Sequence, residues 1–259
     1  MNTAKISGCI ITYNEEKNIE RCVRSLQAVC DEIVIVDSYS TDRTVEICKK
    51  LQVKVFQNEF EGHIEQKNFA LTKCLNNWII SLDADECLSP ELQKAIQELH
   101  LSSSNPVEAY AVNRLTNFAG KWIRHCGWYP DRKTRLFNKN TSRWGGKNPH
   151  DRIEHNERTN IIRLEGDLLH YSFEDISDHV AVINKFSSIG AKSAFDQGRK
   201  PNFFIQVLLE PFYTFIKKYF FQKGFLDGYY GFVICINTAH SKFLKYTKLR
   251  DLHKNADSK

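Results

Sequence analysis

The chain has 259 residues, of which 42% are hydrophobic and 26% charged, and its net charge is +5. These values are ordinary for a globular protein and allow one large domain, or one domain with an extension. Two features are not predicted. A membrane-spanning helix is disfavoured because there is no run of about 18 apolar residues, and a signal peptide is disfavoured because residues 1–5 lack its apolar core. The eight cysteines form no Cys-x-x-Cys pair, so we expect reduced cysteines in a cytoplasmic protein rather than a zinc ribbon.

Strands and helices alternate over the first hundred residues. We expect strands over residues 6–12, 33–36, 53–56 and 78–82, and helices over residues 15–28, 42–51, 64–75 and from Ser89-Pro90 onward. This alternation predicts an α/β fold with a mostly parallel sheet. The glycine-rich loops of dinucleotide-binding and P-loop proteins do not occur, which disfavours both kinds of site.

Residues 109–171 are typical of short strands and loops, and the chain becomes helical after Ser172. We therefore divide it near Pro201 into an α/β domain, residues 1–199, and a helical extension, residues 200–259. The extension carries nine Lys and one Arg against four acidic residues. It also holds 14 of the 31 Phe, Tyr and Trp residues, between Phe203 and Tyr246, so it is both basic and aromatic.

Three acidic residues, Asp83, Asp85 and Glu86, follow directly on the apolar strand over residues 78–82. Open α/β sheets bind ligands at the carboxyl ends of their strands. Carboxylates at that edge suit Mg²⁺ or Mn²⁺, which share their coordination with substrate phosphates. The pattern favours a metal-assisted site for a phosphorylated substrate. For an isolated Asp-x-Asp, solvated acids or helix caps are the alternative interpretation.

Polar residues also follow the first two strands, and a lysine begins the helix before the fourth. These residues are Thr12, Tyr13, Asn14, Glu15, Asp37, Ser38 and Lys67. In a parallel sheet their strand ends meet at one edge, where Asp37 can accept hydrogen bonds from a base or ribose and Lys67 can neutralise a diphosphate. Each one alone is also typical of a turn, a cap or a solvated charge. Their joint occurrence in this order favours a nucleotide site.

With these motifs the chain resembles the family 2 glycosyltransferases, which have the GT-A nucleotide-sugar fold. The resemblance rests on residues 12–15, 36–42, 66–70 and 82–86, and continues through residues 120–122, 127–131, 135–137 and 170–172. The longer pattern is similar to the branch that contains bacterial lipopolysaccharide-core β-1,4-glucosyltransferases. Tyr39 departs from it, because the family usually has glycine there, and a tyrosine must either avoid a positive φ or be strained.

The resemblance implies a role for each matching position. Thr12, Asp37 and Lys67 hold the uridine and the diphosphate, with Tyr13, Asn14, Glu15 and Ser38 in the same nucleotide-sugar site. Asp83 contacts the ribose or the metal, and Asp85 binds the metal. His170 is a further metal or diphosphate ligand, or else a structural histidine. Asp151 is the acceptor-side base, with Asp131 and Glu154 as weaker candidates.

The chemistry of sugar transfer accounts for these groups. A divalent ion and Lys67 stabilise charge on the leaving diphosphate, while a carboxylate on the opposite face takes the proton of the acceptor hydroxyl. Attack from that face inverts the anomeric configuration. We therefore expect an inverting, metal-dependent transferase that moves glucose from UDP-glucose onto a cell-envelope glycan such as lipopolysaccharide core, with no nucleic-acid partner. Transfer to polyprenyl phosphate and a non-catalytic nucleotide-sugar-binding adaptor are the alternatives.

Two aromatic segments are predicted to bind molecules other than the nucleotide. Apolar residues recur at helical spacing over residues 203–221 and 229–246, among Lys217, Lys218 and Lys223, and residues 224–228 interrupt the helix. Such faces fit a helix lying on an anionic membrane surface, so we expect a peripheral protein on the inner face of the cell membrane. Packing on the α/β domain or on a second subunit is the alternative. The strip over residues 118–130 fits a sugar acceptor, or ordinary packing.

Overall fold

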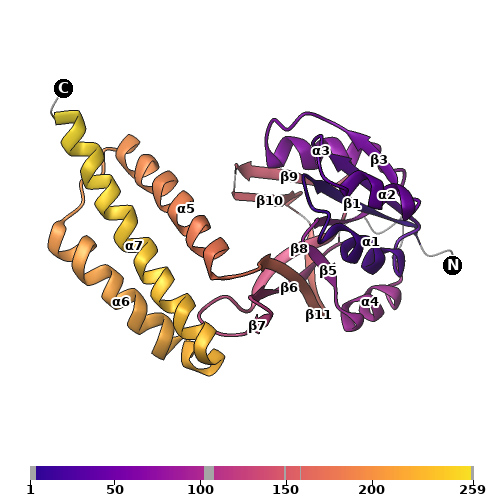
Figure 1. Ribbon diagram of the computed structural model, residues 1–259. Coiled ribbons are helices and arrows are strands. Elements are labelled where there is room, and N and C mark those ends of the chain that lie inside the picture. The colour runs from indigo at the N-terminus through magenta and orange to yellow at the C-terminus, as the bar shows by residue number, and fades with distance from the viewer. Residues whose placement is uncertain (1–3, 102–107, 149, 158, 258–259) are drawn as a thin grey trace. The chain divides into compact units, whose positions relative to one another are not determined.

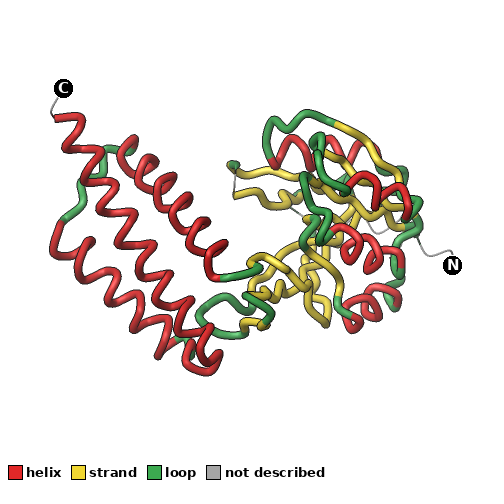
Figure 2. The backbone as a smooth tube through the Cα atoms, viewed as in Figure 1, coloured by secondary structure: helices red, strands yellow, loops and turns green. Residues whose placement is uncertain are grey.

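The strands and helices expected over the first hundred residues occur in the expected order in the computed structural model (Figure 1). The structure describes residues 4–101, 108–148, 150–157 and 159–257. The chain forms two compact units. The α/β unit comprises Met1–Leu115 and Asp131–Tyr171, and the helical unit comprises Thr116–Pro130 and Ser172–Lys259. Strands predominate in the first unit and helices in the second (Figure 2).

Four parallel strands form one half of the main sheet. In the order of the sheet they are β3 (Lys54–Gln57), β2 (Glu32–Asp37), β1 (Ile6–Thr12) and β4 (Trp78–Asp83). The register sets Thr12 beside Asp37 and Ile11 beside Asp83. Because the strands are parallel, their carboxyl ends share one edge of the sheet, as predicted.

Helices cover both faces of these strands. They are α1 (Ile19–Gln27), α2 (Thr44–Lys50), α3 (His63–Lys73) and α4 (Pro90–Gln97). Successive strand residues point to opposite faces, so Ile10 and Ile35 join one apolar cluster with Val23 of α1, while Cys9 and Val34 join another with Ala70 of α3. Burial on both faces explains why these strands are almost continuously apolar. Pro90 opens α4, and Ser89 caps it through a bond from the Leu92 amide, as predicted.

Helix α1 begins later than expected, at Ile19 rather than Glu15. Side chains of the β2–α2 loop and of the first residue of α2 bind the backbone amides that would otherwise start the helix. Ser40 Oγ accepts from the Asn14 amide at 2.8 Å, and Thr44 Oγ1 accepts from the Glu15 amide at 2.8 Å. These bonds fix residues after β1 as a loop at the carboxyl edge of the sheet.

The other half of the main sheet is built from the segment predicted as short strands and loops. Beyond β4 it contains β8 (Asp131–Asn138), β6 (Glu108–Phe118), β11 (Asn160–Phe173) and β5 (Glu86–Leu88), and β7 (Lys121–Ile123) pairs with the end of β6. The β4–β8, β6–β8 and β5–β11 pairs are antiparallel. A separate antiparallel ribbon consists of β9 (Ser142–Lys147) and β10 (His150–His155).

The helical unit consists mainly of three long helical segments. They are α5 (Ile176–Asp196), a continuous helix made of η1 (Phe203–Leu209), α6 (Glu210–Ile216) and η2 (Lys217–Phe221), and α7 (Gly228–Asp257). Both α5 and α6 pack against α7. The predicted break is present as the short helix η3 (Gly224–Asp227). Within the described part of the chain, no helix has the length and apolarity needed to cross a membrane.

Candidate active site

The carboxyl edge of the parallel strands brings the predicted nucleotide residues together. Thr12 and Asp37 are register neighbours on β1 and β2, and both are buried. Asp37 accepts hydrogen bonds from the Ser40 amide at 3.0 Å and from the Ser40 hydroxyl. The Thr12 hydroxyl is buried and has no hydrogen-bond partner among the described residues. A buried polar atom without a partner is unfavourable, so Thr12 is suited to meet a ligand.

Lys67 links two of the predicted acids. Its Nζ lies 2.8 Å from Asp83 Oδ1 and 2.7 Å from Asp151 Oδ2. The Lys67 side chain is only 4% exposed, so this ammonium needs both carboxylates to compensate for the loss of water. The structure therefore joins Asp83, predicted on the nucleotide side, with the predicted base Asp151, although the two lie 68 residues apart in sequence.

Asp151 follows Lys67 by 84 residues in the chain, so it is the fold, rather than sequence proximity, that makes this contact.

Helix α3 and the β9–β10 ribbon hold the Lys67 contact in place. Asn68, the next residue along α3, donates to the Trp144 carbonyl at 2.9 Å and accepts from the Trp144 amide at 3.1 Å. Trp144 lies on β9, and its ring is 4.1 Å from Lys67 Nζ. Asp151 lies on β10 opposite Gly146 of β9. The Lys67-Asn68 pair therefore fixes the ribbon beside the edge of the sheet.

Two residues without an assigned role, Arg135 and Glu86, complete this charge network. Arg135 Nη2 lies 2.7 Å from Glu86 Oε1 and 3.2 Å from Asp83 Oδ2, and both Arg135 and Glu86 are buried. Burial alone would raise the pKa of Asp83, but Lys67 and then Arg135 outweigh it and hold that pKa well below its usual range. Burial likewise opposes the charge of Arg135, but Glu86 and Asp83 raise its pKa. Asp83 and Arg135 are therefore both charged at neutral pH.

Asp85 and His170 form a second, neighbouring pair. Strand β11 pairs with β5, which places His170 opposite Glu86, and the Tyr171 amide donates to the Asp85 carbonyl at 2.9 Å. As a result, His170 Nε2 lies 3.0 Å from Asp85 Oδ2. Both side chains are partly exposed. Sequence reasoning proposed both residues as metal ligands, and the structure puts them in contact.

The donor set at this pair fits a divalent ion that also binds substrate. Among the residues that the structure describes, no three His, Cys, Asp or Glu side chains already form a metal cage. Mg²⁺ is commonly held by one or two protein carboxylates together with substrate phosphates and water, rather than by an all-protein cage. An exposed carboxylate beside an imidazole suits that arrangement. Asp83 is less suited as a ligand, because Lys67 and Arg135 already contact both of its oxygens.

The loop residues around this edge have structural bonds of their own. Asn14 Oδ1 accepts from the Thr41 amide at 2.8 Å, and Ser38 Oγ accepts from Gln66 at 3.0 Å. Burial raises the pKa of Glu15, and the carboxylates of Asp85, Asp42 and Asp83 add to the rise against a hydrogen bond from Asn18. Glu15 therefore lies close to the predicted acids.

Two tyrosines present exposed rings on the same loops. Tyr13 is 57% exposed and Tyr39 is 52% exposed. Tyr39 has φ 63°, so it adopts the left-handed conformation that the sequence flagged as strained for a non-glycine residue. The backbone thus keeps the shape that glycine usually gives this loop, with an aromatic ring added beside the Asp37 site.

The weaker base candidates lie in other interactions. Asp131 Oδ2 is 2.8 Å from Arg114 Nη2, and Asp131 Oδ1 is 3.1 Å from Lys133 Nζ. Glu154 Oε1 is 3.9 Å from Arg152 Nη2. Within the described part of the chain, Asp151 is the base candidate that contacts Lys67 directly, whereas Asp131 reaches the charge network through Arg114, whose Nη1 lies 3.4 Å from Glu86 Oε1.

The aromatic strip over residues 118–130 contributes to packing in the helical unit. Phe118 is fully buried, and its ring lies 6.0 Å from Trp128 and 5.1 Å from His179. For Phe118 and Trp128, packing is therefore the interpretation that the structure supports. In the same unit Asp227 accepts from the His125 amide at 2.8 Å, and its other oxygen lies 3.0 Å from His125 Nδ1, so His125 holds the strip against the start of α7.

Sequence reasoning missed Arg135, Glu86 and Trp144. Arg135 and Glu86 stand inside the quoted motifs, so the signal was present as an opposite-charge pair on two segments that the fold makes adjacent. Trp144 is 3% exposed, and its indole N–H has no partner among the described residues. No sequence signal identified Trp144 as a site residue, because a single tryptophan in a Gly-rich strand does not indicate a contact with a distant lysine.

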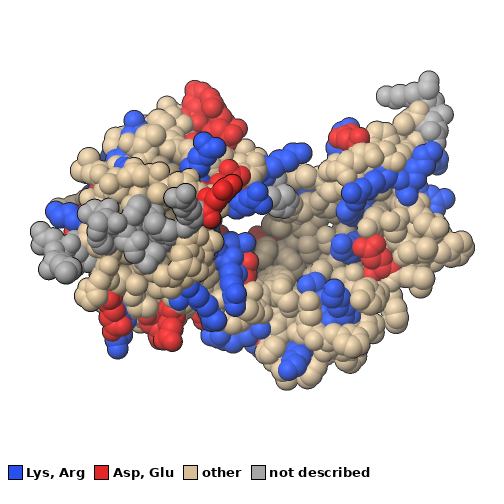
Figure 3. All heavy atoms as spheres, turned by 180° about the vertical axis from the view of Figure 1, so that it is seen from behind, with Lys and Arg blue, Asp and Glu red and all other residues tan. Residues whose placement is uncertain are grey.

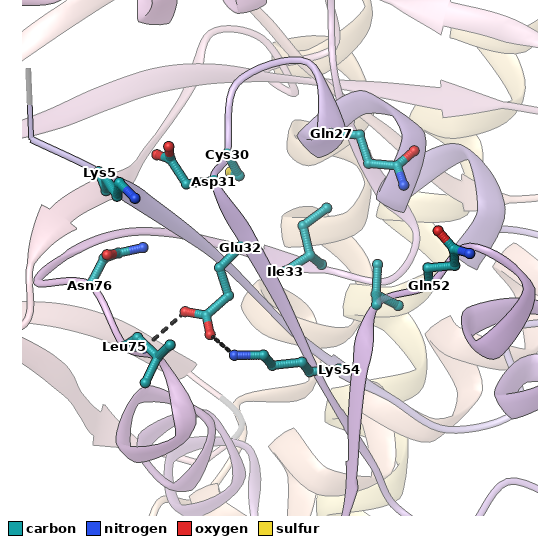
Figure 4. A pocket seen from close by; sticks show the side chains of 11 residues that line it. Lys5, Gln27, Cys30, Asp31, Glu32, Ile33, Gln52, Lys54, Leu75 and Asn76 are labelled. Carbon is teal, nitrogen blue, oxygen red and sulfur yellow. Dashed lines mark hydrogen bonds and ion pairs between the residues drawn. The ribbon is translucent and has the colours of Figure 1, made fainter.

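A cavity of about 390 Å³ lies at the opposite edge of the sheet (Figure 4). Lys5 before β1, Glu32 at the start of β2 and Lys54 at the start of β3 contribute to its lining, and Glu32 Oε1 lies 2.6 Å from Lys54 Nζ. These are the amino ends of the strands. This cavity is therefore separate from the site at the carboxyl edge.

Comparison with known proteins identifies the class of this fold and site. Residues 7–157 match the model of glycosyl transferase family 2. An uncharacterized glycosyltransferase of Rickettsia bellii is 36% identical over 258 residues, which is 96% of this chain and 87% of the relative. The chain therefore belongs to the family 2 glycosyltransferases. Together with the parallel sheet, this confirms the predicted enzyme class and the predicted α/β fold of the GT-A type.

Two further matches are more distant. The lipopolysaccharide core biosynthesis glycosyltransferase LpsC of Rhizobium meliloti is 29% identical over 259 residues, which is 96% of this chain and 93% of LpsC. The crystal structure of S. aureus TarS 1–349 in complex with UDP matches with a TM-score of 0.43 and 16% identity, over 97% of this chain and 92% of that chain. At this distance no residue role is carried over from TarS.

Proposed function

We propose that this glycosyltransferase is an inverting enzyme that uses Mg²⁺ or Mn²⁺ to transfer a hexose, glucose from UDP-glucose, onto a cell-envelope glycan such as lipopolysaccharide core. The observation that carries the proposal is the contact of one buried ammonium, Lys67, with both Asp83 and Asp151 at the carboxyl edge of the sheet. The relative LpsC, whose name states lipopolysaccharide core biosynthesis, supports the acceptor class.

The donor nucleotide occupies the ends of β1 and β2 in this proposal. The buried Thr12 hydroxyl lacks a partner among the described residues, and a base or ribose would supply one. Asp37 is already bonded to Ser40, which orients its carboxylate and leaves acceptor capacity for a ligand donor. The exposed rings of Tyr13 and Tyr39 flank these positions in sequence and can cover a bound base.

The metal ion is assigned to Asp85 and His170. When bound there, it would act as a Lewis acid that stabilises charge on the leaving diphosphate. The protein's own contribution is Lys67. An ammonium has three N–H donors, of which two meet Asp83 and Asp151, so one is left for a diphosphate oxygen.

Asp151 is the general base of the proposed reaction. Its side chain is 15% exposed, so it can be reached from solvent, and Lys67 fixes its Oδ2. It would accept the proton of the acceptor hydroxyl as the oxygen attacks the anomeric carbon. The bond to the diphosphate breaks on the opposite side, so an α-linked donor gives a β-linked product.

A donor screen tests this proposal directly. The thermal unfolding temperature is measured with UDP-glucose, other UDP-sugars, GDP-sugars and dTDP-sugars, each with and without Mn²⁺. A ligand at 100 times its Kd stabilises the folded protein by about 2.7 kcal/mol, so the right donor raises the unfolding temperature by several degrees, and only with metal. NMR of the product then determines the anomeric configuration. Equal shifts with and without Mn²⁺, or an α-linked product, contradict the proposal.

A further inference from the structure

The continuous helix over residues 203–221 has a reversed distribution of side chains. Where it packs against α7 it buries the small residues Val207 and Thr214. Three of its phenylalanines lie on the outside, with Phe204, Phe212 and Phe221 exposed by 69%, 67% and 78%, whereas Phe215 and Tyr219 pack inward on the cluster that contains Ile234. A surface helix of a soluble domain normally turns its large apolar residues inward. Packing on α7 therefore does not explain why these phenylalanines are exposed.

The exposed side chains form a connected face, which we call the aromatic face. Residues 204, 208 and 212 and residues 205, 209 and 213 make two adjacent rows at a spacing of four, and neighbours at this spacing lie one above the other on a helix. We include in the aromatic face the exposed apolar residues of η2, η3 and the start of α7. Its members are Phe203, Phe204, Ile205, Leu208, Leu209, Phe212, Tyr213, Phe220, Phe221, Phe225, Leu226 and Tyr229. Exposed apolar surface of this extent marks a contact with another molecule.

Basic residues border the aromatic face. Residues 197–229 contain Arg199, Lys200, Lys217, Lys218 and Lys223 and two acids, Glu210 and Asp227, of which Asp227 is buried. Glu210 Oε1 lies 3.5 Å from Lys242 Nζ, so its charge is compensated within the unit. On the part of the helical unit seen on the right of Figure 3, Lys and Arg atoms likewise lie among uncharged surface with few Asp or Glu atoms.

One lysine predicted to face a membrane does not do so. Lys218 Nζ donates to the Cys126 carbonyl at 2.8 Å and lies 3.3 Å from Gln222 Oε1, and burial lowers its pKa. It therefore fastens the helix to the residues 121–126 inside the helical unit. Lys200, Lys217 and Lys223 are exposed and remain as the basic border.

The charge pattern distinguishes between two molecules that could cover the aromatic face, a second copy of the chain and a lipid bilayer. In a symmetric dimer the same patch meets itself, so a border made of lysines would face lysines, and like charges in contact are unfavourable. A bilayer with anionic lipids instead offers negative charge to the lysines and an interfacial layer that favours aromatic rings. The observations therefore favour a lipid surface.

We propose that the aromatic face docks on the surface of an anionic phospholipid bilayer, with helix 203–221 lying in the plane of the interface. The exposed phenylalanines enter the headgroup region, and Lys200, Lys217 and Lys223 contact lipid phosphates. This deepens the proposed function by placing the enzyme on the surface that carries lipid-anchored acceptors. The contact itself uses no residue of the nucleotide site.

Vesicle flotation of the full chain tests the docking, without donor or acceptor in the mixture. Vesicles contain either phosphatidylglycerol with phosphatidylethanolamine or phosphatidylcholine alone, at low and high salt. One variant combines Phe204→Ser, Phe212→Ser and Phe221→Ser, and a second combines Lys217→Gln and Lys223→Gln. A matched control, Phe186→Ser with Ile189→Ser, removes exposed apolar residues of α5 that lie outside the face.

Wild type and control should float with the anionic vesicles, and salt should weaken binding. Each lysine removed should weaken it about fivefold, and the phenylalanine variant should lose at least about tenfold. Circular dichroism and donor-induced thermal shift confirm that the variants fold. A wild-type protein that never floats overturns the docking proposal, as does a concentration-dependent dimer that the phenylalanine variant dissociates. The transferase assay is separate, so a failure of docking and a failure of the proposed reaction are told apart.

Discussion

The α/β unit and the helical unit place charged and apolar side chains in opposite ways. At the site of the α/β unit, Lys67, Arg135 and Glu86 are exposed by 4%, 5% and 1%. In the helical unit, Phe204 and Phe221 are exposed by 69% and 78%. One unit thus buries charge where an apolar interior is usual, and the other exposes aromatic rings where a polar surface is usual.

Both arrangements are unfavourable for an isolated protein, but for different reasons. A buried charge is tolerated only with a partner, and the network from Lys67 through Asp83 to Arg135 supplies partners within the chain. An exposed apolar face forgoes about 25 cal/mol for each Å² left in water, and the described residues do not cover it. The difference teaches that the buried charges of the site have their partners within the chain, whereas the exposed aromatic face is the surface that we propose is covered by a bilayer.

The largest expected effect concerns the acid pair beside this network. Asp85→Asn should lower kcat by at least about 1,000-fold, because it removes a ligand of an ion that stabilises leaving-group charge. The fold should persist, since Asp85 lies at a strand end and is partly exposed. Steady-state kinetics and circular dichroism measure the two effects. Full activity of the variant, or of the wild type in EDTA, would show that the site works without a metal.

The helical unit offers the contrasting case of an ionisable group buried among aromatic rings. Burial lowers the pKa of His179 to about 4. The ring lies 4.8 Å from Phe173, and its Nδ1 is 3.1 Å from the Asn237 amide nitrogen. Below the usual pKa of about 6.5, the unfolded chain takes up the proton first, so the folded state loses stability as the pH falls from about 6.5 towards about 4.

The loss from this one histidine should approach about 3 kcal/mol at low pH. Urea unfolding at pH values between 7 and 4 measures it. His179→Gln cannot titrate, so the difference in unfolding free energy between wild type and variant should shrink over this range, while the effects of the acids common to both cancel. A difference that stays constant with pH would mean that His179 titrates normally and that this interior is not as dry as the packing indicates.

The sequence predicted the part of the site that follows the strands. Thr12, Asp37 and Asp83 are strand-end residues, and hydrophobic patterning locates strand ends well because both faces of the parallel strands are buried. Asp85 follows the same strand end as Asp83, and the family resemblance added His170 and Asp151. The contact of Lys67 with Asp151 was not predicted, because it depends on the β9–β10 ribbon, whose pairing places Asp151 opposite Gly146 without a periodic apolar signal.

The sequence was less informative about which way side chains face in the helical unit. Spacing predicted that residues 203–221 are helical, but it gave no reason to distinguish Lys217, Lys218 and Lys223, which were all predicted to face a membrane. The direction of each depends on where α7 and the residues 121–126 lie, and Lys218 is turned inward by the Cys126 carbonyl. The late start of α1 has a similar cause, because Ser40 before α2 and Thr44 at the start of α2 bind the amides after β1.

A smaller kinetic effect should identify which carboxylate is the general base. Asp151→Asn should lower kcat by at least about 100-fold, the usual contribution of a general base. Donor binding, measured by thermal shift with UDP-glucose, should fall less than kcat, because the base acts on the acceptor and the asparagine carbonyl can still accept a hydrogen bond from Lys67. Asp131→Asn and Glu154→Gln are the comparison variants, since Asp131 pairs with Arg114 and Glu154 with Arg152 rather than with Lys67. If either comparison variant abolishes turnover while Asp151→Asn does not, another acid is the base.

The smallest effect should come from the exposed rings of the helical unit, and it tests the comparison most directly. Phe204→Ser or Phe221→Ser should change the free energy of unfolding by no more than about 0.5 kcal/mol, as is usual for exposed positions. Phe118→Ala, at a fully buried ring of the same unit, should reduce it by about 3–5 kcal/mol. Urea unfolding of the three variants without lipid measures this contrast. A loss of 2 kcal/mol or more at Phe204 or Phe221 would mean that these rings pack inside the protein in solution, and the opposition between the two units would then disappear.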